Sequence, residues 1–220
     1  MKNIERRRLL QWIGTLGAAG VSGYLSDVLA AGDAPPGLHK LDGTGTINGK
    51  PAQAGAPIAL GDKIATGPNS QAVVVLKGDA FLLRSNTQVE IAGSSGVLSS
   101  LTIATGRVLS VFSKKPVGIK AASATIGIRG TGAYVEVEPS EVYFCLCYGE
   151  AAVNGPNMKE EVVQTKHHEK PLLFTTSGGT MKSAPGGFRN HKDDELIMLE
   201  ALVGREPPFL KGGQYPSMKY

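Results

Sequence analysis

The sequence predicts an all-β protein, built as an antiparallel sandwich or roll of hairpins, with one short C-terminal helix. Glycine accounts for 29 of the 220 residues, whereas aromatic residues make up only 6%, a balance that favours many turns and short strands. Between residues 40 and 156, short apolar runs alternate with turn residues, and no helical periodicity interrupts them. Strands that recur at roughly 8–12-residue spacing are typical of a sandwich, roll or barrel.

Several turns can be assigned from their residue types. Asn48-Gly49 lies between two short runs and is typical of a type I′ hairpin turn. Residues 67–70 (Gly-Pro-Asn-Ser) have the composition of a turn. A hairpin is predicted from the runs 72–76 and 80–83, joined by a turn at 77–79. Further strands are expected at 89–91, 101–103 and 108–112, the last two separated by Thr105-Gly106.

The N-terminal segment, residues 1–31, has the pattern of an export signal. Residues 6–10 (Arg-Arg-Arg-Leu-Leu) resemble the twin-arginine signal, and Ala30 or Ala31 is the expected last residue before cleavage. An uncleaved N-terminal anchor is the alternative. No apolar stretch of about 18 residues follows, so no membrane span is expected in the mature chain. The sequence therefore predicts a periplasmic protein.

The charge distribution argues against a nucleic-acid-binding protein. The formal net charge is +4, but half of it lies in the first 30 residues and the rest is spread thinly. Nucleic-acid binding requires a concentrated positive surface, which this pattern does not provide. No Gly-x-Ser-x-Gly motif is present either. We therefore expect a non-catalytic protein whose partner is an envelope protein or a small ligand.

Two motifs resemble the periplasmic domain of FecR-type proteins. Residues 61–67 (Gly-Asp-Lys-Ile-Ala-Thr-Gly), followed by residues 70–76, are similar to the family's first signature. Residues 124–131 (Ala-Thr-Ile-Gly-Ile-Arg-Gly-Thr), followed by a strand at 134–137, resemble its second. The resemblance implies a β domain, placed here at residues 38–156, with a binding or regulatory role. FecR proteins carry an anti-sigma segment and a membrane helix before this domain, and only about thirty residues precede it here, so sigma-factor control is not expected.

An extension, residues 157–220, follows the β domain and contains one predicted helix at about 191–203. Asn190 is expected to cap the helix, which places His191 in its first turn, and Gly204 is expected to end it. Residues 211–220 are expected to form a flexible tail. An apolar stripe predicts that the helix docks on the β domain; it comprises Leu196, Ile197, Leu199, Leu202 and Val203.

Two cysteines lie on one predicted hairpin, residues 133–149, which turns at Pro139-Ser140. Pairing around this turn places Val137 opposite Val142 and Gly132 opposite Cys147. Because side chains alternate along a strand, Cys145 and Cys147 should share the face opposite the apolar residues. Their Cα atoms would be about 6.6 Å apart with parallel side chains, so a disulfide between them would break the strand.

Paired thiols on one strand are suited to binding a shared metal or cofactor. Thiolates bind zinc, copper(I), iron and iron–sulfur centres, and imidazoles complete many four-coordinate sites. The sequence therefore predicts, as an alternative function, a site with Zn, Cu, Fe or an iron–sulfur centre that serves electron transfer, sensing or delivery. Two alternatives stay open: cysteines that are simply packed in the interior, and an intermolecular disulfide. The predicted ligands are Cys145, Cys147, His167, His168 and His191.

Overall fold

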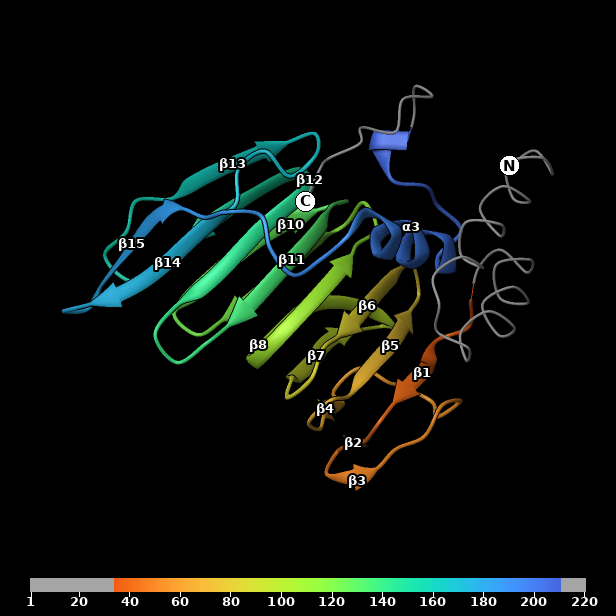
Figure 1. Ribbon diagram of the computed structural model, residues 1–220. Coiled ribbons are helices and arrows are strands. Elements are labelled where there is room, and N and C mark those ends of the chain that lie inside the picture. The colour runs from red at the N-terminus through yellow and green to blue at the C-terminus, as the bar shows by residue number, and fades with distance from the viewer. Residues whose placement is uncertain (1–33, 211–220) are drawn as a thin grey trace.

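The computed structural model describes residues 34–210, and within this range it confirms an all-β fold with one short α-helix (Figure 1). The predictions for the export signal and for residues 211–220 lie outside the described residues. In order, the strands are β1 (Gly37–Asp42), β2 (Gly45–Ile47), β3 (Lys50–Pro51), β4 (Lys63–Thr66), β5 (Gln71–Leu76), β6 (Asp79–Leu83), β7 (Gln88–Ser94), β8 (Val97–Val111), β9 (Pro116–Ala121), β10 (Ala124–Arg129), β11 (Gly132–Val137), β12 (Val142–Asn154), β13 (Glu161–Thr165), β14 (Leu172–Ser177) and β15 (Thr180–Pro185). The helix α3 (Asp193–Leu202) and the 3₁₀ helix η1 (Pro208–Leu210) follow.

The strands form two sheets that share the long strands β8 and β12. The inner sheet has the order β1-β5-β6-β8-β11-β12-β14-β15, and the outer sheet has the order β3-β2-β4-β7-β8-β9-β10-β12-β13. Each shared strand passes from one sheet to the other at a glycine with positive φ, Gly106 at 89° and Gly149 at 100°. Only glycine adopts such a conformation without strain. The prediction that Thr105-Gly106 separates two strands is therefore wrong: Gly106 bends one continuous strand.

The predicted hairpin turn at Asn48-Gly49 is confirmed, whereas the predicted pairing of the strands is only partly correct. Ile47 pairs with Lys50 across Asn48 and Gly49, which have φ values of 52° and 77°, as a type I′ turn requires. The prediction that all strands pair antiparallel is wrong for one pair, because β8 and β9 run parallel. The chain can make this parallel pair because β8 leaves the outer sheet before β9 returns to it.

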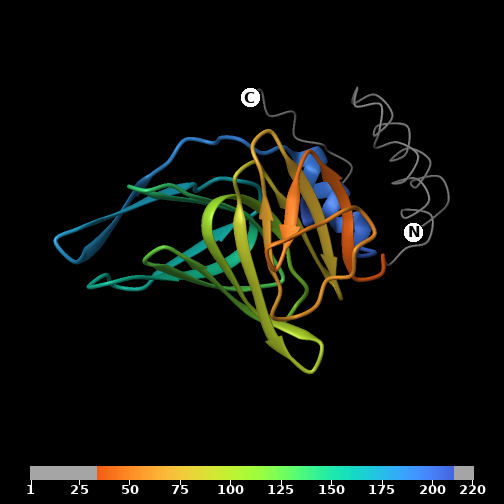
Figure 2. The ribbon, with the colours of Figure 1, turned by 90° about the horizontal axis from the view of Figure 1, so that it is seen from below.

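The central strands of the inner sheet, such as β5, β6 and β11, are buried on both faces, so residues 34–210 form two apolar cores. Along β5, Val74 points into the core between the sheets, whereas Val73 and Val75 point into a second core on the opposite face. The helix α3 covers that second face and contributes Leu199 to it (Figure 2). A strand buried on both faces needs apolar residues at successive positions, which explains the run Ala72–Leu76.

The extension adds β13, β14 and β15 to the sheets and then forms α3. The helix begins later than predicted, with Lys192 rather than Asn190 as its N-cap residue. Asn190 has a φ of 60°, which does not suit the extended N-cap position, and its side-chain amide donates to Glu136 at 2.6 Å. His191 therefore precedes the helix and is not part of its first turn. Gly204, with φ 69°, follows the helix end as predicted.

No helix within residues 34–210 has the length and apolar content needed to span a bilayer.

Candidate metal centre

The hairpin β11–β12 holds both cysteines, and its register agrees with the prediction for five successive pairs, from Val137–Val142 to Ala133–Leu146. The next pair differs, because Gly132 lies opposite Tyr148 and not Cys147. The register shift is a β-bulge, in which one strand carries an extra residue. The space beside Gly132 is filled by the Tyr148 ring, which a Cβ atom on this glycine would approach to 2.5 Å.

The two cysteines share one face of β12, as predicted, but that face is not open to solvent. Cys145 and Cys147 belong to the second core, whereas Phe144 and Leu146 belong to the core between the sheets. Both cysteines are free and 0% exposed. The expectation of thiols turned away from the apolar interior is therefore corrected: they face a second interior, which the extension closes.

Two histidines of the extension converge on the thiols. His168 lies in the loop between β13 and β14, where its backbone N–H donates to the Cys147 carbonyl at 3.1 Å. His168 Nδ1 lies 3.5 Å from Cys145 Sγ and 3.2 Å from His191 Nε2. One ligand atom from each of Cys145, Cys147, His168 and His191 lies within 4.8 Å of all the others, and all four residues are buried. The structure thus brings together four of the five predicted ligands.

The outer nitrogens of these two imidazoles are held by oxygen acceptors. His191 Nδ1 donates to the Arg189 carbonyl at 2.7 Å, and His168 Nε2 donates to the Asp193 carboxylate at 3.0 Å. With a proton on each outer nitrogen, the inner nitrogens of the neutral rings present lone pairs to each other. Such a contact is favourable only with a proton or a cation at the inner nitrogens. Metal-binding histidines in proteins are commonly oriented by this kind of outer hydrogen bond.

His167 takes a different position from its neighbour. Its Nε2 lies 2.9 Å from Asp193 Oδ1, and its ring packs on Phe209 with centroids 4.5 Å apart. The carboxylate of Asp193 therefore lies between the two adjacent histidines. Asp193 is not among the predicted ligands, because acidic residues in a first helical turn are explained more simply by the positive helix N-terminus than by a bound cation.

The electrostatic environment favours a thiolate at one cysteine. A hydrogen bond from Cys147 lowers the pKa of Cys145 to about 3, against the effect of burial and with the help of His168 and His191. Burial raises the pKa of Cys147 well above its usual range. For His168, burial acts to lower the pKa, but the hydrogen bonds to Asp193 and Cys145 outweigh it and raise the pKa to about 9. The thiolate is the form of cysteine that binds metals.

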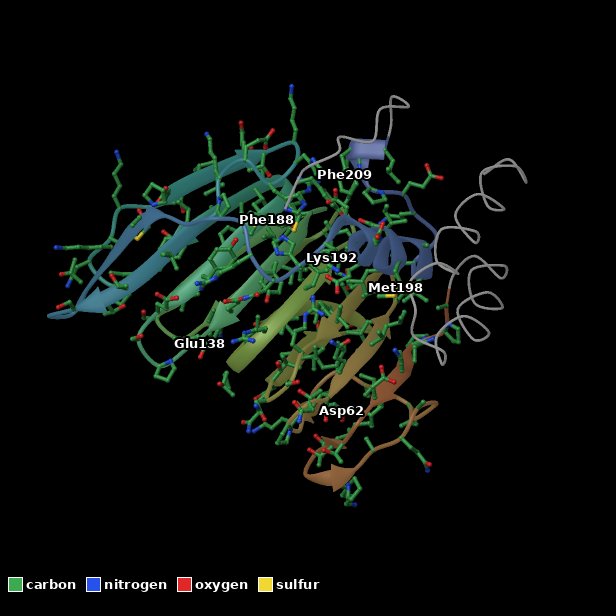
Figure 3. The ribbon with its side chains drawn as sticks, in the orientation of Figure 1. Asp62, Glu138, Phe188, Lys192, Met198 and Phe209 are labelled. Atoms are coloured by element: carbon green, nitrogen blue, oxygen red, sulfur yellow. The ribbon has the colours of Figure 1, made fainter. Side chains whose placement is uncertain are left out.

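Aromatic rings enclose the cluster. Tyr134 stacks on His191 with ring centroids 4.4 Å apart, and Phe188 packs against His191 at 4.5 Å and His168 at 4.8 Å. Phe188 and Lys192 lie along the segment that leads into α3 (Figure 3). This enclosure resembles that of a structural metal site, in which the protein supplies every ligand, more than a catalytic one with an open position.

Comparison with known proteins gives a partial likeness only. No protein-family profile matches the chain, and no curated protein matches its sequence. Two crystal structures of a proposed anti-sigma factor from Parabacteroides distasonis are similar to it, with TM-scores of 0.48 and 0.47 and sequence identities of 12% and 13%. Each comparison covers 56% of this chain and 59% of the chain of the anti-sigma factor. A likeness at this level concerns part of the fold and carries no conclusion about activity.

Proposed function

We propose that this protein is a non-catalytic binding module in which Cys145, Cys147, His168 and His191 hold a single Zn²⁺ ion. The distances from His168 Nδ1 to Cys145 Sγ and to His191 Nε2 carry the proposal, with Cys147 Sγ within 4.8 Å of all three atoms. A tetrahedral Zn²⁺ with Zn–N of about 2.05 Å and Zn–S of about 2.3 Å separates two nitrogens by about 3.3 Å, and sulfur from nitrogen by about 3.6 Å. The corresponding distances here are 3.2 Å and 3.5 Å.

The ligand set distinguishes among the metals that thiolates bind. Two sulfurs and two nitrogens in a tetrahedral arrangement favour zinc. An iron–sulfur cluster of the two-cysteine, two-histidine type places the cysteines on one iron and the histidines on the other. The contact of 3.5 Å between Cys145 Sγ and His168 Nδ1 leaves no room for two irons and their bridging sulfides. A single ion therefore fits the site better than a cluster.

The positions of the ligands in the fold suggest what the ion does. Cys145 and Cys147 belong to a strand shared by both sheets, whereas His168 and His191 belong to two separate segments of the extension. One ion would therefore bind the extension to the inner sheet. All four ligands come from the protein, so no coordination position remains for a substrate, in keeping with a structural or regulatory role.

Metal analysis of the protein purified without a histidine tag, under anaerobic and reducing conditions, tests the proposal. We expect about one zinc per chain, and less than about 0.1 in the Cys145→Ser/Cys147→Ser double variant, because a structural site needs its thiolates. His39→Gln is the control, since His39 lies on β1, contacts the Pro35 carbonyl and belongs to neither cluster of possible ligands. A native protein that stays metal-free after incubation with zinc would rule the proposal out.

We further propose that the module works in the cell envelope after twin-arginine export, on the basis of residues 6–10. Arg6→Lys/Arg7→Lys should leave the protein in the cytoplasm with its N-terminus unprocessed, whereas Arg8→Lys should be exported normally. Cell fractionation measures both. Equal export of the two variants would contradict this route.

A further inference from the structure

The carboxylate of Asp193 lies directly behind one of the proposed ligands. Asp193 Oδ1 accepts from His168 Nε2 at 3.0 Å, and His167 Nε2 lies 2.9 Å from the same oxygen. The residue is only 3% exposed. Both imidazole contacts use the Asp193 side chain as an acceptor, as an ionised carboxylate requires. A buried negative charge is thus separated from the ion position by one imidazole ring.

The charge of the bound ion determines how this carboxylate affects binding. Two thiolates carry two negative charges, so a divalent ion forms a neutral centre with Cys145, Cys147 and two neutral histidines. A monovalent ion such as Cu⁺ leaves the same centre with one negative charge. Net charge is costly in the protein interior, and a second negative charge nearby adds to the cost.

We propose, on the basis of the zinc site proposed above, that Asp193 makes this centre select a divalent over a monovalent ion. Its orienting effect on the His168 ring is the same for either ion, whereas its electrostatic effect scales with the charge of the ion. The ring and the metal–nitrogen bond place the ion about 6 Å from the carboxylate. At an effective dielectric constant of about 20, one unit of charge at that distance changes a ratio of dissociation constants by about 100-fold.

Asp194 provides a matched control for this role. It occupies the next position in the first turn of α3 and carries the same charge at the same helix terminus. It is half-buried and does not belong to the cluster of His167, His168 and Asp193. Asp193→Asn and Asp194→Asn therefore remove equal charge from one helix end, and only the first removes it from behind a ligand.

The test is to measure the dissociation constants of Zn²⁺ and Cu⁺ by anaerobic competition with chromophoric chelators. We expect Asp193→Asn to shift the ratio of the two constants in favour of Cu⁺ by about 10- to 100-fold, and Asp194→Asn to shift it by less than about 3-fold. His167→Lys keeps the carboxylate but places a cation beside it, so it should shift the ratio in the same direction as Asp193→Asn.

The possible outcomes distinguish a failure of the proposed zinc site from a failure of the role proposed for Asp193. If the native protein binds neither ion, the proposed function fails. If it binds zinc, and Asp193→Asn weakens both ions by the same factor, Asp193 only positions His168 and the inference is overturned. If Asp193→Asn does not fold, the ratio in His167→Lys decides, and an unchanged ratio there also overturns it.

Discussion

At the scale of single residues, His167 and His168 are neighbours in the sequence whose rings enter different environments. His168 has a φ of 58°, and this left-handed conformation turns its ring toward the thiols. The His167 ring contacts the Asp193 carboxylate from the other side and packs against the Phe209 ring. The histidine doublet therefore supplies one proposed ligand and one residue that supports it through Asp193.

This division predicts unequal effects of three substitutions on zinc affinity. His168→Gln and His191→Gln remove proposed ligands and should weaken zinc binding by more than about 100-fold, whereas His167→Gln, outside the ligand set, should cost about 10-fold or less. Competition with a chelator measures all three. Loss of binding in His167→Gln as severe as in His168→Gln would show that the ligand assignment is wrong.

At the scale of elements, α3 is held by the second core. Leu196, Leu199 and Leu202 are each 0% exposed and lie in the same apolar cluster as Cys145. Polar contacts also fix the start of the helix, since Arg84 pairs with Glu195 at 2.8 Å. The helix is therefore a structural layer of the protein, packed on the inner sheet.

We expect Leu199→Ala to lower the free energy of unfolding by about 2–5 kcal/mol, because it leaves a cavity in a closed core. Met198 is the neighbouring control. It is half-buried, so Met198→Ala should cost about 1 kcal/mol or less. Urea denaturation of the metal-loaded proteins measures both values. Equal, small losses would mean that α3 contributes little to the second core.

At the scale of the whole molecule, the proposed ion would connect the two sheets to two irregular segments of the extension. The two sheets enclose a large apolar core of their own, to which the ion makes no contribution. The segments 166–171 and 186–192 carry the histidines and contain no strand or helix. Loss of the ion should therefore loosen these segments first and leave the sheets intact.

Hydrogen exchange with and without a chelator tests whether the ion stabilises these two segments and not the sheets. Amides of 166–170 and 186–192, including the His168 N–H that donates to Cys147, should exchange at least about 10-fold faster after metal removal. Amides that pair β5 with β6 should not change. The Cys145→Ser/Cys147→Ser variant is the control and should not respond to the chelator. A uniform increase over all strands would indicate that the ion supports the whole fold.

Features that depend on a few neighbouring residues were accessible from the sequence. Asn48-Gly49 forms the expected turn because few other pairs adopt two positive φ values. The turn at Pro139-Ser140 sets the register of five pairs, and strand alternation then places Cys145 and Cys147 on one face. The helix start was missed by two residues because Asn190 bonds to Glu136, a partner 54 residues away.

Short-range backbone and side-chain rules are enough to predict an all-β chain, its local turns, one apolar helix and a pair of thiols on one strand face. The three-dimensional arrangement was needed to show that this face is a second core, that Gly106 and Gly149 carry strands between sheets, and that Asp193 lies behind His168. These features join residues that are tens of positions apart. Their proximity depends on the path of the whole chain, which no local pattern specifies.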